Sequence, residues 1–267
     1  NSGAEAVETA IKVARKWAYE VKGIEKFKAE IIAAEGNFHG RTISIVSFST
    51  EEFYREAFGP FTPGFKVVAY GDLEAMEAAI TPNTCAIMVE PIQGENGVVL
   101  PPEGYLQGLY KLCRKHNLLL IADEIQTGLC RTGKWLASQH EGVRPDIVCL
   151  GKALSGGMYP VSAVVADKEV LGLLRPGEHG STFGGSPLAS AIALASLEVL
   201  ENEKLDEKAT ELGEYFMAKL RQIKTKKVKE IRGKGLLIGI ELKPEAGGAR
   251  KYCEALQELG ILCKETH

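Results

Sequence analysis

Short apolar runs of strand length alternate with segments of helical spacing, and this alternation constrains the fold more than any other feature. The strand-like runs lie at residues 29–34, 65–70, 85–89, 118–122, 147–150 and 161–166. The helical patterns lie at residues 4–21, 72–80, 105–116 and 187–202. Strands separated by helices form βαβ units, which build a mostly parallel sheet with helices on both faces. The sequence therefore predicts an α/β fold.

The pattern changes after a lysine-rich stretch at residues 224–229. Residues 228–242 predict two strands, and residues 249–259 predict a helix. We therefore expect a large domain over residues 1–222 and the beginning of a smaller C-terminal α+β domain over residues 223–267. The chain starts without Met and stops just after an apolar stretch, so we expect it to be an internal portion of a longer protein.

Composition argues against several classes of function. The formal net charge of −3, from 32 basic and 35 acidic residues, gives no sign of a nucleic-acid partner. No apolar run approaches the roughly 18 residues that span a bilayer, so no membrane partner is expected. The six cysteines have no paired spacing and form no cluster with histidines. We therefore expect free thiols in a reducing compartment and no metal site.

The first chemical signal is Lys152, in a glycine-rich turn that follows the apolar run 147–150. Open α/β sheets bind ligands at the carboxyl ends of their strands. A lysine that is partly withdrawn from water there can lose its proton and attack an aldehyde to form a Schiff base. The alternative is a surface lysine beside an ordinary loop, and lone lysines are common.

The second signal is Asp123, which directly follows the apolar run 118–122 and is expected at the same edge of the sheet as Lys152. A carboxylate there suits pyridoxal phosphate chemistry, because it keeps the pyridine nitrogen protonated. The alternative is a helix cap or a surface turn. Together with the turn that carries Lys152, this aspartate makes the pattern specific.

Two further segments suit a phosphate group. Small residues at positions 1–4 precede a helix, whose first N–H groups and dipole favour an anion. Ser2 followed by Glu5 also predicts a capping box, and the two interpretations are compatible. The loop at residues 180–185 carries hydroxyls among glycines, which by itself is a weak signal.

Segments spread over nearly the whole chain, and in the same order, resemble the class III family of pyridoxal-phosphate-dependent aminotransferases. FHGRT and ADEIQTG are typical of the family in general, whereas FGPFTPGF and GKALSGGMYPVSAV resemble its ornithine-acting branch. The other matching segments are NSGAEAVETAIK, VEPIQGENGVV, DIVCL and GEHGSTFGG. The resemblance implies the fold type I architecture of these transferases and pyridoxal phosphate as the cofactor.

The resemblance also implies roles around the cofactor ring. Lys152 would carry the cofactor as a Schiff base and move a proton between substrate and cofactor. Asp123 would pair with the pyridinium nitrogen, and Gln126 would hydrogen-bond the 3′-oxygen. Phe38 would stack on one face of the ring and Ile125 would pack on the other.

A phosphate site shared by two subunits is implied as well. The N–H groups of Gly3 and Ala4 would hold the phosphate within the chain. Ser181 and Thr182 would reach the phosphate of the neighbouring subunit, so we expect a homodimer or a larger homo-oligomer built from dimers. Ser186 stands where the family usually has Asn, which bears on how the loop before it is held.

The implied substrates are an amino acid and a 2-oxo acid. Arg41 would grip a substrate carboxylate, although a structural ion pair explains it equally well. Glu95 would pair with a second arginine beyond residue 267, and Glu90 would support the same wall or be structural. His39 is expected to contact cofactor or substrate loosely, or to pack. We expect L-ornithine to pass its δ-amino group to 2-oxoglutarate, which gives glutamate 5-semialdehyde and glutamate.

Several alternatives remain open. Acetylornithine and 4-aminobutyrate aminotransferases share the cofactor residues, and a non-catalytic binding module or a generic nucleotide-binding domain would share the fold class. The set of Lys152, Asp123 and Gln126 argues against a non-catalytic module. The expected compartment is the cytoplasm for a bacterial source and the mitochondrial matrix for a eukaryotic one.

Overall fold

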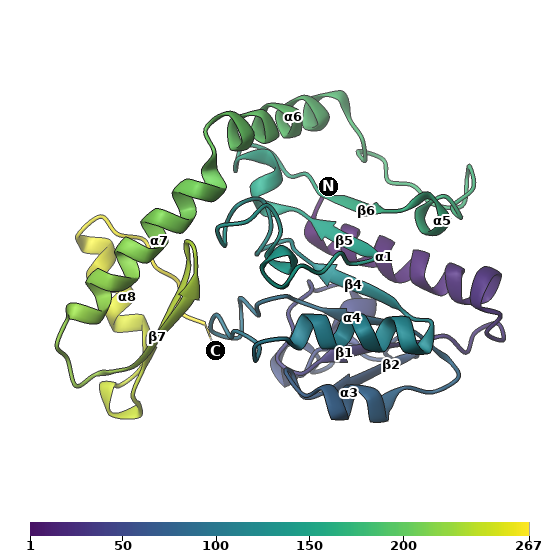
Figure 1. Ribbon diagram of the computed structural model, residues 1–267, viewed down its shortest axis with the longest axis horizontal. Coiled ribbons are helices and arrows are strands. Elements are labelled where there is room, and N and C mark those ends of the chain that lie inside the picture. The colour runs from purple at the N-terminus through teal and green to yellow at the C-terminus, as the bar shows by residue number, and fades with distance from the viewer. Residues whose placement is uncertain (267) are drawn as a thin grey trace.

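The computed structural model describes residues 1–266, and its central feature is a six-stranded sheet in the order β2-β1-β3-β4-β5-β6 (Figure 1). Strands β1 to β5 pair in parallel, and β6 pairs antiparallel with β5 at the edge. The strands are β1 Glu30–Ala34, β2 Phe65–Val68, β3 Thr84–Val89, β4 Leu119–Asp123, β5 Ile147–Leu150 and β6 Ala163–Ala166. The predicted α/β fold with a mostly parallel sheet is confirmed.

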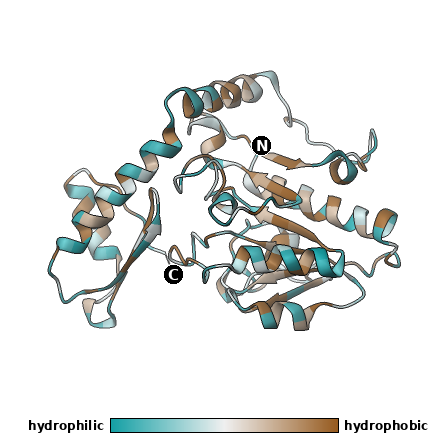
Figure 2. Ribbon diagram, viewed as in Figure 1, coloured by the Kyte–Doolittle hydropathy of each residue, from teal (hydrophilic) through white to brown (hydrophobic). Residues whose placement is uncertain are grey.

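Successive strand residues enter two different cores, one on each face of the sheet. Ile31 packs into the core under α1 (Gly3–Trp17), whereas Ile32 packs into the core under α3 (Leu73–Ala79) and α4 (Tyr105–His116). Side chains of a strand alternate between faces, so a strand covered on both sides must be apolar at nearly every position. Figure 2 shows the central strands as predominantly hydrophobic ribbons.

Helix α1 begins at the capping box that the sequence predicts. The Ser2 hydroxyl accepts from the N–H of Glu5, and the Glu5 carboxylate accepts from the N–H of Ser2 at 2.8 Å. Val7, Ile11 and Ala14 recur at helical spacing and are buried against the sheet. The helix continues into a π-helical turn, Ala18–Lys22, which ends at Gly23 in the left-handed backbone conformation.

Helix α6 (Pro187–Asn202) leads into α7 (Leu205–Gln222), which the sequence analysis did not predict. Beyond it, β7 (Val228–Lys234) and β8 (Leu237–Leu242) form an antiparallel hairpin, and α8 (Arg250–Glu258) follows. We call residues 228–266 the C-terminal lobe. Helix α7 packs against this hairpin. The boundary between a large domain that ends at residue 222 and a smaller domain that begins at residue 223 stays a prediction. The remaining α-helices are α2 Ile43–Val46 and α5 Lys168–Leu171.

Helices long and apolar enough to cross a membrane are not found in residues 1–266. The six cysteines form no disulfide, and four of them are buried. Over the same residues, His, Cys, Asp and Glu side chains form no cluster of three or more suited to a metal ion.

Candidate active site

The two residues that sequence analysis placed at one edge of the sheet do lie together. Asp123 is the last residue of β4 and pairs in register with Cys149 of the parallel strand β5. Lys152 follows β5 by two positions and has a φ of 40°, in the left-handed region that non-glycine residues rarely occupy. Such backbone strain persists only where the surroundings over-determine it, and it concentrates at functional sites.

A pocket opens at this edge, between the start of α1 and the loops that follow β1, β3, β4 and β5. It contains all the predicted cofactor residues except Ser181 and Thr182, and it also contains Glu95. The residues that line it are Gly3, Ala4, Phe38, His39, Gly40, Glu90, Glu95, Asp123, Ile125, Gln126 and Lys152. Four loops and a helix N-terminus, far apart in sequence, therefore converge on one cavity.

Asp123 is held by two hydrogen bonds within the protein. Its Oδ2 accepts from Nδ1 of His39 at 2.6 Å, and its Oδ1 accepts from the N–H of Ile125 at 3.0 Å. The side chain of His39 is fully buried. Burial alone would lower the pKa of this imidazole, but the hydrogen bond to Asp123 and the negative charges nearby outweigh it and raise the pKa. The aspartate is therefore fixed beside an imidazole whose protonated form it favours.

His39 is the residue whose importance sequence analysis underestimated, because it was expected only to pack or to make loose contacts. Its Nε2 is buried and has no hydrogen-bond partner among the described residues. A buried polar atom of this kind normally finds a partner, and His39 is one of the residues that line the pocket. The motif FHGRT was the available signal, but the contact with Asp123 spans 84 positions.

Glu90 is a second buried carboxylate at the pocket. It accepts from the N–H groups of Phe38 at 2.8 Å and of Gly94 at 3.2 Å, and so ties two pocket loops together. Burial is the main cause that raises its pKa to about 7, and the negative charge of Asp123 adds to the effect.

Lys152 reaches into the pocket with a free amine. Its Nζ has no hydrogen bond or ion pair within residues 1–266. Burial lowers the pKa of the ammonium group, against the opposing charges of Glu95 and the two buried carboxylates. The side chain still borders the solvent in the open pocket, while the protein atoms around it remove enough water to disfavour the charge. A lysine in this setting is suited to act as a nucleophile and a base.

Glycines allow the pocket walls to approach closely. A Cβ on Gly3 would lie 3.0 Å from Cδ1 of Ile125, and one on Gly94 would lie 1.2 Å from Oε1 of Gln126. Gly3 and Ala4 are the first residues of α1, where N–H groups have no partner within the helix. The pocket thus combines an anion-binding helix start, an apolar wall, a fixed carboxylate and a free amine, which fits pyridoxal phosphate.

Arg41 does not line this pocket. Its guanidinium lies over the ring of Tyr54 at 4.2 Å from the centroid and 5.8 Å from that of Phe38. Phe38 and Tyr54 meet edge to face at 5.8 Å. Arg41 therefore packs on Phe38, which lines the pocket, and on Tyr54, which does not and which the sequence analysis did not single out.

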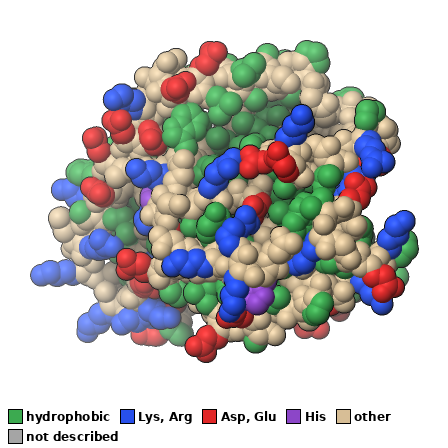
Figure 3. All heavy atoms as spheres, turned by 45° about the vertical axis from the view of Figure 1, so that its right-hand side comes forward, with side chains coloured by type: hydrophobic (Ala, Val, Ile, Leu, Met, Phe, Trp, Pro, Cys, Tyr) green, Lys and Arg blue, Asp and Glu red, His purple; other side chains and the backbone are tan. Residues whose placement is uncertain are grey.

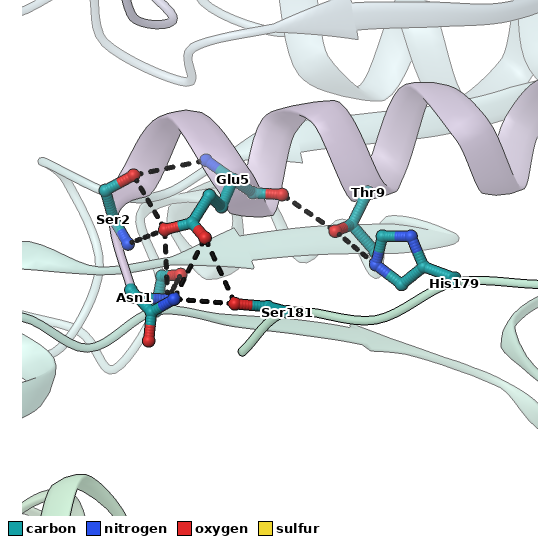
Figure 4. A network of polar contacts seen from close by, with 7 residues as sticks. Asn1, Ser2, Glu5, Thr9, His179 and Ser181 are labelled. Atoms are coloured by element: carbon teal, nitrogen blue, oxygen red, sulfur yellow. Dashed lines mark hydrogen bonds and ion pairs between the residues drawn. The ribbon is translucent and has the colours of Figure 1, made fainter. Parts of the chain in front are cut away.

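Ser181 and Thr182 also lie outside the pocket. The Ser181 hydroxyl accepts from Nδ2 of Asn1 at 2.7 Å and donates to Oε1 of Glu5 at 3.3 Å, and Thr182 is exposed. Figure 4 shows Ser181 turned toward the start of α1, with His179 against Thr9 farther along the same helix. Hydrogen bonds from Asn1 and Ser2 lower the pKa of Glu5 to about 2, so the carboxylate stays charged.

Comparison with known proteins extends over the whole chain. The family description Aminotransferase class-III matches residues 1–267. An ornithine aminotransferase of Exiguobacterium sp. is 60% identical over 267 residues, which are 100% of this chain and 66% of that protein. The chain thus spans just under two thirds of the length of such relatives.

Two solved structures are similar throughout. The ornithine aminotransferase of Toxoplasma gondii ME49 superposes with a TM-score of 0.98 at 51% identity, over 100% of this chain and 64% of that one. An acetylornithine aminotransferase of Elizabethkingia anophelis superposes with a TM-score of 0.88 at 53% identity, over 100% of this chain and 67% of that one.

Proposed function

The chain belongs to the class III aminotransferase family, and from this premise we propose that the protein carrying it transfers the δ-amino group of L-ornithine to 2-oxoglutarate. The products would be glutamate 5-semialdehyde and glutamate. The observation that carries the proposal is the meeting of Lys152 and Asp123 in one pocket at the ends of adjacent parallel strands. The cofactor would be pyridoxal phosphate.

The residues of the pocket would divide the binding of the cofactor among them. When bound, pyridoxal phosphate supplies a ring that accepts electrons from the reacting carbon of the substrate. Asp123, fixed by His39, would face the ring nitrogen with a negative charge, and Gln126 would hydrogen-bond the 3′-oxygen. Phe38 and Ile125 would enclose the ring. Gly3 and Ala4 would hold the phosphate at the start of α1.

Lys152 would perform the proton transfer. Because burial lowers the pKa of its ammonium, a larger fraction of the side chain is neutral near pH 7 than for a lysine in water. Its Nζ would then remove the proton from the carbon that bears the amino group and return it at the cofactor. General bases work best when their pKa lies near the working pH.

Substrate choice would depend on Arg41 and Glu95. An arginine suits a carboxylate because it donates two parallel hydrogen bonds. If Arg41 holds the α-carboxylate of ornithine, the δ-amine rather than the α-amine faces the cofactor. This role requires the guanidinium to turn from the ring of Tyr54 toward the pocket. Glu95, which lines the pocket, would bear on the choice between a cationic donor and an anionic acceptor.

An acetylornithine aminotransferase is the second candidate, since the Elizabethkingia anophelis protein of that name is 53% identical to this chain. The purified protein, loaded with pyridoxal phosphate, should be assayed with L-ornithine, N-acetyl-L-ornithine and 4-aminobutyrate at equal concentrations. The highest kcat/KM is expected for L-ornithine. A higher value for either competitor would overturn the ornithine assignment, and no turnover with any donor would overturn the aminotransferase assignment.

We propose further that the protein is a homodimer and that α6 contributes to the interface. This helix is rich in apolar residues, yet only Ala189 of its sixteen residues is buried. Leu188 and Leu194 are 57% and 61% exposed. In Figure 3, hydrophobic side chains gather in the upper part of the molecule, where α6 lies in Figure 1. An exposed apolar surface of this kind marks an interaction site.

A further inference from the structure

Residues 178–181 lie along the solvent-facing side of α1, and we call them the docked segment (Figure 4). The segment is exposed and has no helix or strand of its own. Apart from bonds within the loop 175–186, its hydrogen bonds within residues 1–266 go to α1 and to Asn1, which precedes that helix. The position of the docked segment therefore depends on side chains at α1.

Four residues of α1 hold the docked segment, and they are spaced three or four positions apart along the helix. They are Glu5, Thr9, Lys12 and Lys16. Residues at this spacing share one side of a helix. Ser181, at one end of the segment, contacts the first of the four, and Glu178, at the other end, forms an ion pair with the last at 2.7 Å. The segment therefore follows one side of α1 over about three turns.

His179 makes the central contacts, and its two ring nitrogens have different roles. Nδ1 lies 3.0 Å from Nζ of Lys12, and Nε2 lies 3.0 Å from Oγ1 of Thr9. An ammonium group can only donate, so Nδ1 accepts and the proton of the neutral ring is on Nε2. That proton is donated to Thr9, whose own hydroxyl donates to the carbonyl of Glu5 at 2.7 Å. Burial and the charge of Lys12 lower the pKa of His179, which agrees with a neutral ring.

The docked segment leads directly into the two hydroxyls that are expected at the phosphate of a neighbouring subunit. Ser181 is its last residue, and Thr182 follows. Neither residue lines the pocket of its own chain. Only Gly180 separates His179 from Ser181, so a shift of the imidazole would displace the first hydroxyl as well. The contacts of His179 with α1 therefore set the position of groups that would serve another subunit.

We propose that His179 is a positioning residue for the cofactor site of the partner subunit. Held by Thr9 and Lys12, its imidazole fixes the docked segment. Ser181 and Thr182 are thereby presented to the phosphate of the cofactor that the partner binds. The inference rests on the proposed function and on the proposed homodimer, because it requires a phosphate in the pocket of the second subunit.

Two mixed dimers of the full-length protein separate an effect on the partner from an effect on the same chain, because each has a single intact Lys152. In the first, a Lys152→Ala subunit is paired with a His179→Ala subunit, so the segment that serves the intact lysine is native. In the second, a native subunit is paired with a subunit that carries both substitutions, so the segment that serves the intact lysine is altered. Two different affinity tags isolate each mixed dimer.

The readout is the Kd of pyridoxal phosphate, measured from the amount of cofactor that borohydride fixes to Lys152. This Kd should stay native in the first mixed dimer and rise about threefold to tenfold in the second, as suits the loss of one neutral hydrogen-bonded link. His179→Gln, in place of His179→Ala, should restore the affinity of the second dimer, because a neutral amide keeps a donor and an acceptor. His116→Ala is the matched control and should leave the Kd unchanged in both arrangements, because this histidine contacts Glu77 at 3.0 Å and does not line the pocket.

The two mixed dimers must differ in the stated direction. A Kd that rises in the first dimer, or that stays native in both, would show that His179 does not act on the partner's site, and the inference would be wrong. If the unmodified protein fixes no pyridoxal phosphate at Lys152, the proposed function itself fails. If it sediments as a monomer while active, the proposed homodimer fails, and the inference falls with it.

Discussion

Replacing Asp123 by Asn would test the centre of the proposed site with almost no change of shape. Asn keeps an oxygen for the N–H of Ile125, which now donates at 3.0 Å, but it removes the negative charge. The loss of fixed electrostatic support of this kind typically costs about 2.7–4 kcal/mol of barrier, or roughly 10²- to 10³-fold in kcat. We expect a folded protein whose turnover falls by that factor.

The same substitution should change the titration of His39. In the native protein, burial lowers the pKa of His39, but the hydrogen bond to Asp123 and the charge of Asp123 raise it by more. The net effect is a raised pKa. Protonated His39 therefore adds stability below its unfolded pKa of about 6.5, and this contribution is lost as the pH rises through the raised pKa. In Asp123→Asn, burial should lower the pKa, so the variant should lose stability as the pH falls. The difference in free energy of unfolding should be largest near pH 5.

Glu124→Gln is the matched control, because it removes the neighbouring buried carboxylate. Glu124 accepts from the N–H groups of Ala137 at 2.9 Å and Ser138 at 2.8 Å, outside the pocket. Its replacement should cost about 1–3 kcal/mol of stability with kcat nearly unchanged, since an amide leaves one donor unmatched. The native protein and the two variants are compared by their turnover, their cofactor absorbance and their unfolding in urea at pH 5 and pH 8. Near-normal kcat in Asp123→Asn, or equal losses of kcat in both variants, would refute the assigned role.

Four further predictions follow from the site and the surface. Borohydride reduction and peptide mapping should find the pyridoxyl group on Lys152, and a label on another lysine would contradict the site. Arg41→Ala should raise KM for both substrates and lower kcat/KM, whereas unchanged values would leave Arg41 with only its aromatic contacts. Gly94→Ala should displace Gln126, because the added Cβ would lie 1.2 Å from Oε1 of that side chain. Equilibrium dialysis should then show weaker binding of the cofactor. Unaltered affinity would show that the Gln126 side chain is not needed for cofactor binding. Leu194→Asp should give monomers in sedimentation experiments while Leu259→Asp does not, and a Leu194→Asp dimer would exclude α6 from the interface.

Local sequence patterns predicted the elements well where apolar spacing was strong. The predicted strand at 147–150 and the predicted helix at 187–202 coincide with β5 and α6. Helix α7 was missed, although Leu205, Leu212 and Phe216 recur at helical intervals, because charged residues fill the positions between them. The ends of the elements were predicted less accurately, since the strand expected over 161–166 begins at Ala163.

The contacts that complete the site were harder to predict than its chemical groups. The chemistry of pyridoxal phosphate calls for a lysine and a carboxylate, which the sequence offers at Lys152 and Asp123. The order of strands in the sheet brings these two residues together. The hydrogen bond between His39 and Asp123 joins the loop after β1 to the last residue of β4, so it depends on the order of strands across the sheet. No spacing along the chain encodes the ion pair between Glu95 and Lys264, which lie 169 positions apart.

That sequence separation also has a consequence for synthesis on the ribosome. Lys264 leaves the ribosome 169 positions after Glu95, which at about 5–20 residues per second corresponds to a delay of roughly ten to thirty seconds. The strands and the loop that carries Glu95 are made well before the lysine that pairs with it. The ion pair between Glu95 and Lys264 therefore cannot form until the C-terminal lobe has been made, long after the loop that carries Glu95.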